Sequence, residues 1–409
     1  MIIPFKIAPR LVYLVNMLQN MLFCIPILML YYQSKGVFGG DFFLIQSISL
    51  AAVFFLEIPT GYIADLFSRK ITLIIGLLGW ICGYFCWILG YGFTFILLGE
   101  LIFSIGISFI SGTLDAYLYD LLKQNKKQHL YHKKLSKMVT CGNIGLLTAT
   151  LSGGFFYEFS GTNSPAILSI ICLLLGILIM IFLPDVKENR RKVQKGKSKL
   201  KDILDISKST IKNKQIKWLM IFPAIYGSLT LTLMWGLQSV MIATKIPVFM
   251  FSIVLGANAL TRTIWSMFAG MILDKAGLKK SVIILCFLII ISLISAILAT
   301  NLPIFAVYIC LLLMIVSSGS RSLISIVSTT LINHQIQSDE RATVLSVKNM
   351  TDKIASCIAM LLLKPLFDHF SVTITFMIIS LFIIPVIMSA YHLIKLQIPS
   401  QEKKDCSLI

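Results

Sequence analysis

The sequence predicts an all-α membrane protein whose twelve transmembrane helices form two pseudo-symmetric bundles of six, and three observations lead to this class. Hydrophobic residues make up 57% of the 409 positions and charged residues only 13%, far from the balance of a soluble protein. Apolar runs of about 20 residues, the length of a helix that crosses the hydrocarbon core, recur along the chain. A polar segment with an Asp interrupts this pattern at equivalent places in both halves, as GYIADLFSRK at 61–70 and GMILDKAGLKK at 270–280.

The apolar runs place six spans in each half of the chain. In the first half they cover 11–32, 41–63, 71–90, 93–121, 136–157 and 164–184. In the second half they cover 217–243, 247–272, 281–299, 302–331, 343–364 and 372–394. The first run follows Lys6 and Arg10, but it is too long for a secretory signal and lacks a small-residue cleavage site. We therefore expect it to remain in the protein as an anchor.

The basic residues predict the orientation in the membrane. The formal net charge of +18 comes from 36 Lys and Arg against 18 Asp and Glu. Most of the basic residues fall in the loops after the even-numbered spans and in both tails, whereas the other loops hold Lys35, Lys245 and Lys364. Because basic loops stay on the cytoplasmic side, we expect both termini in the cytoplasm. The positive charge follows membrane topology, so nucleic acid is not an expected partner.

A strongly basic stretch after the sixth span predicts the division into domains. We expect an N-terminal bundle at 1–184, a cytoplasmic linker at 185–216, a C-terminal bundle at 217–396 and a cytoplasmic tail at 397–409. The second part of the linker, KDILDISKSTIKNKQIK, has the apolar spacing of an amphipathic helix. Such a helix lies on the anionic inner leaflet or serves as a solvated connection.

The two polar segments share a Gly, an Asp four residues later, and basic residues after it. The matching positions are Gly61, Asp65, Arg69 and Lys70 in the first copy, and Gly270, Asp274, Lys275, Gly277 and Lys279 in the second. Together with the six-plus-six pattern, they resemble the major facilitator superfamily, which carries this signature between the second and third helices of each half. Leu66, Ser68 and Leu278 depart from the signature.

The resemblance implies that the two segments form a conformational latch on the cytoplasmic side. A carboxylate such as Asp65 at a helix end accepts hydrogen bonds from backbone donors that another helix leaves exposed at its N-terminus. The family implies that this helix is span 11, near Arg341, and that Arg69 pairs with Asp120 at the inner end of span 4. It also implies that spans 1, 4, 7 and 10 line a central cavity, while spans 3, 6, 9 and 12 face lipid.

Ionisable residues inside the spans are functional candidates, because a charge at the bilayer centre costs at least about 2.5 kcal/mol. They are Glu57, Glu100, Asp115, Arg262, Arg321, Asp352 and Lys353. Glu57 and Lys353 suit either a salt bridge between the halves or direct participation in transport. Arg262 and Asp352 suit a second structural pair. Glu100 either gates the outer side or reaches water.

Asp115 is the leading candidate for proton coupling, and Glu57, Glu100 and Asp352 are further candidates. Asp115 lies on a predicted cavity span and has no obvious basic neighbour in its own half. A partly buried carboxyl group without a fixed partner can bind and release a proton near neutral pH. We expect Arg321, on the opposing cavity span, either to bind an anionic group of the substrate or to compete with the proton for Asp115.

Uncharged polar side chains complete the predicted cavity. The cavity candidates are Asn16, Gln19, Asn20, Tyr226, Trp235 and Gln238, together with Arg262 and Arg321. A mixed aromatic and amide lining favours an amphipathic organic substrate over a sugar. In span 5, GLLTATLSGG at 145–154 resembles the antiporter signature of exporters in the superfamily at Gly145, Gly153 and Gly154. Close helix packing is the alternative interpretation of these glycines.

These features predict a secondary active transporter that works by alternating access, in the first place a proton-coupled exporter of a small amphipathic compound or drug. Uptake or facilitated transport of a small metabolite is the alternative, and a transporter-like sensor or scaffold is the second. We expect no enzymatic activity, cofactor or metal site, because no phosphate-binding loop, triad or metal motif occurs. The expected setting is a bacterial plasma membrane, with the substrate, protons and lipid as partners of a monomer.

Overall fold

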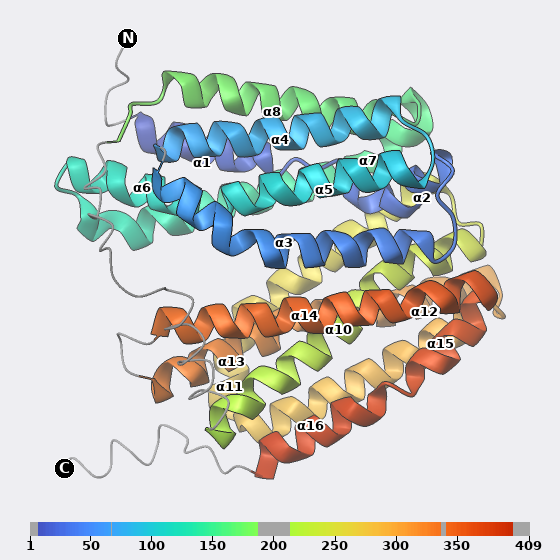
Figure 1. Cartoon of the computed structure of the whole chain (residues 1–409). Coiled ribbons are helices and arrows are strands. Elements are labelled where there is room, and N and C mark those ends of the chain that lie inside the picture. The colour runs from blue at the N-terminus through green and yellow to red at the C-terminus, as the bar shows by residue number, and fades with distance from the viewer. Residues whose placement is uncertain (1–6, 67, 187–212, 337–340, 396–409) are drawn as a thin grey trace, which may run out of the picture. The chain divides into compact units, whose positions relative to one another are not determined.

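The computed structural model describes residues 7–66, 68–186, 213–336 and 341–395, with side chains described at these positions except 57–59, 61–66, 334 and 341–343. Every regular element within these ranges is a helix (Figure 1). The predicted all-α class is therefore confirmed. The proposed linker helix and the tail at 397–409 lie outside the described residues.

The described residues fall into two compact units. The first unit lies within 1–194 and includes 245–256, and the second lies within 195–244 and 257–409. The predicted boundaries at 184, 216 and 396 stay a prediction, because most of the linker is not described.

The first unit begins with helices that correspond to spans 1 to 6. They are α1 (Ala8–Gln19), the short η1 (Ile25–Ile27), α2 (Leu28–Ser34), α3 (Asp41–Leu66), α4 (Arg69–Leu89), α5 (Phe93–Ile110), α6 (Thr113–Gln124), η2 (Gln128–Leu130), α7 (Tyr131–Ser160) and α8 (Ser164–Phe182). Within this unit α1 packs against α7 and α8, and α4 packs against α5 and α8.

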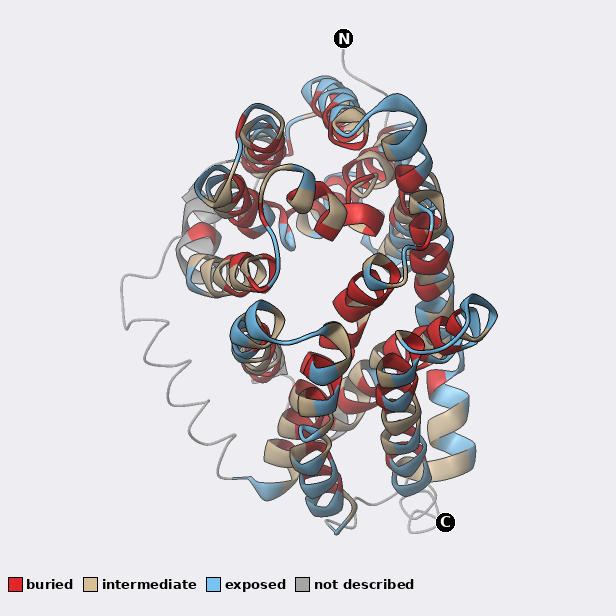
Figure 2. Cartoon of the chain, turned by 90° about the vertical axis from the view of Figure 1, so that its right-hand side faces the viewer, coloured by how far each residue is buried: buried red, intermediate tan, exposed pale blue. Residues whose placement is uncertain are grey.

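The remaining helices correspond to spans 7 to 12. They are α10 (Lys214–Ala243), α11 (Val248–Ala299), α12 (Ile304–Gly319), α13 (Arg321–Gln335), α14 (Arg341–His369), α15 (Val372–Ser380) and α16 (Ile383–Lys395). In the second unit α10 packs against α12, α13, α14 and α16. Its central position agrees with its burial, since most of its residues are buried. Figure 2 colours the described residues by their burial, and many helices carry both buried and exposed residues.

Four predicted spans are interrupted, which corrects their description as continuous helices. Span 1 breaks between α1 and η1, where Pro26 lacks the N–H that a continuing helix needs. Span 4 breaks at Ser111 and at Gly112, which has a φ of +71°. Span 10 bends at Ser320, and span 12 is divided between α15 and α16. Two of these breaks place polar side chains inside the first unit, as shown below.

Spans 8 and 9 lie on one long element, α11, with the second polar segment between them. Gly277 interrupts the helical geometry there, with φ of 68° and ψ of 168°, a conformation that a side chain would strain. The turn that the sequence predicts between these spans is thus made at a glycine of the signature.

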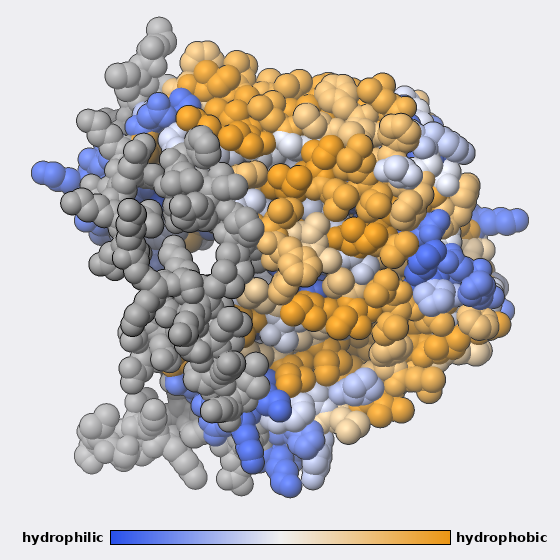
Figure 3. All heavy atoms as spheres, viewed as in Figure 1, coloured by the Kyte–Doolittle hydropathy of each residue, from blue (hydrophilic) through white to orange (hydrophobic). Residues whose placement is uncertain are grey.

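The described helices have the apolar exterior of a membrane protein. Eight helical stretches among the described residues are long and apolar enough to cross a membrane. On α8 the exposed large hydrophobic side chains form one stripe, which consists of Ile167, Ile171, Leu174, Leu175, Leu178, Ile181 and Phe182. Hydrophobic residues also dominate the visible surface in Figure 3. Water would not tolerate such a surface on a monomer, whereas lipid would.

Candidate functional site

A polar cavity of about 300 Å³ lies within the first unit, between α1, the α5–α6 junction and α7. We call it the amide pocket. Its polar lining consists of Asn16, Gln19, Asn20, Ser111, Asp115 and Asn143. Four of these residues, namely the three amides of α1 and Asp115, are cavity or proton candidates from the sequence. The structure therefore brings residues about a hundred positions apart into one site.

A hydrogen-bond network fixes the amides of α1. Asn16 Nδ2 donates to the Met138 carbonyl oxygen of α7 at 2.8 Å. Asn16 Oδ1 accepts from Gln19 Nε2 at 2.7 Å and from Asn20 Nδ2 at 3.2 Å. Gln19 Oε1 is buried and has no hydrogen-bond partner within the described structure. Because an unpaired buried acceptor is costly, this oxygen is suited to receive a hydrogen bond from a bound solute.

Glycines of α7 allow the chain of span 1 to approach closely. A Cβ atom at Gly142 would lie 2.5 Å from Asn16 Nδ2 and 3.1 Å from Asn20 Nδ2. At Gly145 it would collide with the Met17 carbonyl oxygen, and at Gly153 with the Phe23 carbonyl oxygen. Two of the three glycines at the antiporter-like positions, Gly145 and Gly153, are thus explained by close packing on span 1, the alternative that the sequence left open.

Asp115 owes its place to the break in span 4. Gly112, in the left-handed conformation, separates α5 from α6. Because α6 begins at Thr113, Asp115 lies in the first turn of that helix. The positive end of the helix dipole favours a carboxylate at this position. Its side chain is exposed at the pocket and makes no hydrogen bond or ion pair within the described residues. Asp115 is therefore accessible to a proton or to a donor group of a solute.

Glu100 lies elsewhere in the first unit and is buried, with 7% of its surface exposed. It accepts a hydrogen bond from Tyr32 Oη, one from Gln46 Nε2 at 3.2 Å and one from Ser49 Oγ at 3.0 Å. All three donors are neutral. The alternative in which Glu100 reaches water is wrong, because the carboxylate is buried and these three side chains surround it.

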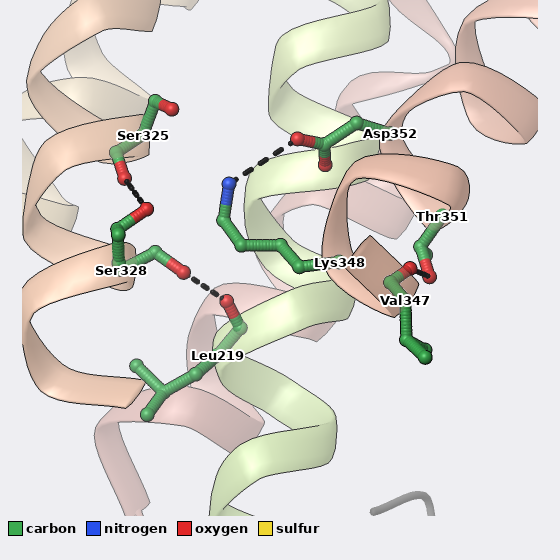
Figure 4. Close-up of polar contacts among 8 residues, drawn as sticks. Leu219, Ser325, Ser328, Val347, Lys348, Thr351 and Asp352 are labelled. Carbon is green, nitrogen blue, oxygen red and sulfur yellow. Dashed lines mark hydrogen bonds and ion pairs between the residues drawn. The ribbon is translucent and has the colours of Figure 1, made fainter. Parts of the chain in front are cut away.

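The second unit contains a group of interacting charges, which we call the basic cluster: Arg262, Arg321, Lys348 and Asp352. Lys348 Nζ lies 3.3 Å from Asp352 Oδ2, one turn further along α14 (Figure 4). The charge of Asp352 also acts on Arg321, which in turn lies near Arg262. The predicted alternative, a pair between Arg262 and Asp352, is therefore wrong, because the ion pair of Asp352 is made with Lys348.

Lys348 is absent from the sequence-based set of charges inside the spans. It lies close enough to the cytoplasmic end of span 11 to be grouped with the basic residues of the cytoplasmic side. The structure buries it to 2% exposure. The available signal was its spacing, because Lys348 and Asp352 are four residues apart and so share a helix face.

Neighbouring helices hold the two arginines of the basic cluster. Ser322 Oγ donates to the Arg262 carbonyl oxygen at 2.7 Å, which joins α13 to α11. The Arg321 guanidinium lies over Gly227 of α10, whose Cβ position is 3.4 Å from Arg321 Nε. Figure 4 shows a further connection, from Ser328 Oγ of α13 to the Leu219 carbonyl oxygen of α10.

The span 7 candidates are buried and line neither the amide pocket nor its rim. Tyr226 is fully buried, and its hydroxyl lies 2.5 Å from Ser320 Oγ. Gln238 is fully buried as well, and Trp235 has 9% exposure. Their role in a cavity stays a prediction, but the aromatic lining that favoured an amphipathic substrate is not found in the amide pocket.

The latch candidates show one of the expected contacts. Arg69 Nε lies 2.6 Å from Asp120 Oδ2, and Lys70 Nζ donates to the Ile181 and Leu183 carbonyl oxygens. The side chains of Glu57, Gly61 and Asp65 lie outside the described set. In the second copy Gly270, Asp274, Lys275 and Lys279 lie on α11 on either side of Gly277. The latch function itself stays a prediction.

Comparisons with known proteins place these features in context. A model of the Major Facilitator Superfamily matches residues 11–360. A curated relative, "Uncharacterized transporter BU466" of Buchnera aphidicola subsp. Acyrthosiphon pisum, is 28% identical over 201 residues, which are 47% of this chain and 48% of the relative. The chain thus matches about half the length of this relative.

Solved structures of transporters resemble the chain over almost its whole length. The nucleoside transporter NupG has a TM-score of 0.76 at 19% identity, with 94% of this chain and 98% of that one covered. A D-xylose-proton symporter has a TM-score of 0.71 at 14% identity, with 98% and 99% covered. A bacterial homologue of the iron transporter ferroportin, in an inward-facing state, has 0.70 at 15%, with 96% and 97% covered. At these identities the likeness shows the fold alone.

Proposed function

Because the chain belongs to the major facilitator superfamily, we propose that it is a secondary transporter which moves a small polar organic solute across the membrane by alternating access, coupled to protons. The observation that carries the proposal is the amide pocket, where an unpaired acceptor of Gln19 and the accessible carboxyl group of Asp115 line one cavity. The proposal includes the plasma membrane as its location and both termini in the cytoplasm.

The lining of the pocket supports a polar solute. Amides and a carboxyl group recognise hydrogen-bond donors, and a cavity of about 300 Å³ suits a small metabolite. Aromatic side chains, which would favour an amphipathic drug, are not among the residues that line it. Two of the similar structures, a nucleoside transporter and a D-xylose-proton symporter, support a polar solute, and the symporter also supports proton coupling.

Asp115 is the proposed coupling residue. Its carboxyl group is accessible from the pocket and is not held by a cation, so a proton and a donor group of the solute compete for it or bind together. Glu100 and Asp352 are weaker candidates, because each already accepts hydrogen bonds from protein groups.

Export of an amphipathic compound is the second candidate function. The feature that favours it is the segment GLLTATLSGG in α7, which matches the exporter signature at three glycines. Because close packing on span 1 accounts for two of these glycines, we place export second.

The test uses the full chain in proteoliposomes that enclose a pH-sensitive dye. Addition of a transported solute should move protons across the membrane, and an imposed pH gradient should drive accumulation of that solute. Asp115→Asn should retain exchange of solute between the two sides, but lose accumulation driven by the gradient. Asp368→Asn, a carboxyl group paired with Lys364 outside the pocket, serves as the matched control.

Two results would count against the proposal. Accumulation by Asp115→Asn that still follows the pH gradient fully would remove Asp115 as the coupling residue. Failure of neutral, cationic and anionic metabolites alike to cross the membrane, while amphipathic dyes are exported, would favour the second candidate.

A further inference from the structure

The basic cluster of the second unit has more positive than negative charge. Lys348 and Arg321 interact with a single carboxylate, Asp352, whereas Arg262 interacts with Arg321. Among the described residues of this unit, Arg262 makes no ion pair with an acidic side chain. All four lie on helices of the predicted spans 8, 10 and 11, and a cation without a counterion is costly inside a membrane. The cluster therefore carries two positive charges that no described acidic side chain balances.

Lys348 pairs with the carboxylate of the basic cluster, so the two arginines are the cations without an ion-pair partner there. It is buried, and its ammonium group takes Asp352 as a partner on its own helix, at 3.3 Å. A guanidinium would otherwise be the better partner for a carboxylate, because it donates two parallel hydrogen bonds. Lys348 holds Asp352 through Oδ2, and Oδ1 is buried without a hydrogen-bond partner. Within the described residues Arg321 makes no ion pair with this carboxylate, so its donors have no carboxylate bound to them.

Arg321 is placed so that its donors are available to a ligand. Its Nε side lies over Gly227, where the absence of a side chain allows the flat guanidinium to pack against α10. Arg321 is half-buried and Arg262, beside it, is exposed, so neither is sealed inside the helix packing. Two adjacent guanidinium groups repel each other, and an anion between them removes the repulsion.

We propose that the basic cluster binds an organic anion through its carboxylate or phosphate group, with Arg321 and Arg262 as its donors and Lys348 as the positioning residue. This inference rests on the proposed transport function and names the substrate class within it: an organic anion. It also explains why the embedded charges of the second unit are mainly basic.

The experiment measures binding rather than transport, with the purified full chain in detergent micelles. Each probe is an anion with a neutral counterpart of similar shape: benzoate with benzamide, glucuronate with glucose, and glycerol phosphate with glycerol. Thermal unfolding is followed as each probe is titrated, because a ligand that binds the folded state raises the midpoint further as its concentration increases relative to its Kd. The first two pairs report on carboxylates and the third on phosphates.

We expect at least one anion to raise the unfolding midpoint while its neutral counterpart does not, and added salt to weaken the effect. Arg321→Gln should weaken binding of that anion by about 10- to 100-fold, the value of a charge-assisted hydrogen bond. Arg321→Lys keeps the positive charge, so its affinity for the anion should lie between those of the wild type and Arg321→Gln. Lys364→Gln, a basic residue of the same unit outside the cluster, should bind as the wild type does.

A separate set of variants tests whether Lys348 positions the anion site or only stabilises the fold. Lys348→Met should weaken anion binding, because Asp352 then becomes available to Arg321. Lys348→Met combined with Asp352→Asn should restore most of the affinity, since the competing carboxylate is gone. Asp352→Asn alone should bind the anion at least as tightly as the wild type.

Three outcomes would overturn the inference: no anion stabilises the chain, anions and neutral counterparts stabilise it equally, or Arg321→Gln keeps the wild-type preference for anions. Because the measurement involves no pH gradient, it can fail while proton-driven transport through Asp115 succeeds, or the reverse. The two proposals are therefore tested separately.

Discussion

Replacement of Tyr32 by Phe tests whether Glu100 is a buried carboxylate. The substitution removes only the hydroxyl that donates to Glu100, on a fully buried ring that packs between Phe42 and Trp87. A neutral hydrogen bond between membrane helices contributes about 0.6 kcal/mol on average, whereas a bond to a charged group contributes about 1.5–3 kcal/mol. We therefore expect Tyr32→Phe to lower the free energy of unfolding by about 2 kcal/mol.

The neighbouring Tyr31 is the matched control. It is equally buried and also donates through its hydroxyl, but to the neutral Asn163 Oδ1 at 3.3 Å. Tyr31→Phe should therefore cost only about 0.6 kcal/mol. Unfolding in mixed detergent micelles, followed by tryptophan fluorescence, compares the two variants under the same conditions. In a Glu100→Gln background, Tyr32→Phe should become as mild as Tyr31→Phe.

Equal costs for the two tyrosine variants would refute this reasoning. Such a result would mean that Glu100 is held as a neutral carboxylic acid, and that Tyr32 makes an ordinary bond to it. A cycle in which the Glu100→Gln background leaves the cost of Tyr32→Phe unchanged would lead to the same conclusion.

The packing and latch contacts lead to two further predictions. Gly145→Ala should lower the free energy of unfolding by about 1–3 kcal/mol, because the new Cβ meets a backbone oxygen. Gly176→Ala, whose Cβ would meet Leu18 at an ordinary 3.9 Å, should be tolerated in the same unfolding assay. Arg69→Gln and Asp120→Asn should each cost less than about 1 kcal/mol, since the pair is partly exposed. If the pair acts as a latch, both should change the transport rate equally and the double variant no further; additive rate effects would contradict that role.

Much of the candidate site was predictable from residue type and position along the spans. Asn16, Gln19 and Asn20 fall on one side of a single helical stretch, and Asp115 lies on another cavity span, so their convergence in the amide pocket follows from the family's helix order. The contact between Arg69 and Asp120 was predictable for the same reason. These predictions needed only the knowledge of which helices are neighbours.

Other features required the coordinates. The breaks at Gly112 and Ser320 are invisible to hydropathy, because the residues around them remain apolar enough to continue a span. Glu100 is enclosed by Tyr32 and by side chains of α3, which a pattern along one helix cannot reveal. The partner of Asp352 was misassigned because only Arg262, on a neighbouring span, was considered, whereas Lys348 on the same helix was left out of the set.

The sequence by itself determined that this chain crosses the membrane repeatedly as helices, because backbone groups in lipid must be satisfied within each segment and composition records that requirement. Tertiary structure alone decided how the buried charges are shared. Lys348 pairs with Asp352 Oδ2, whereas Arg321 makes no ion pair within the described residues and packs over Gly227. This arrangement depends on the rotation of each helix about its axis and on a few ångströms of packing. Hydropathy carries no record of either quantity.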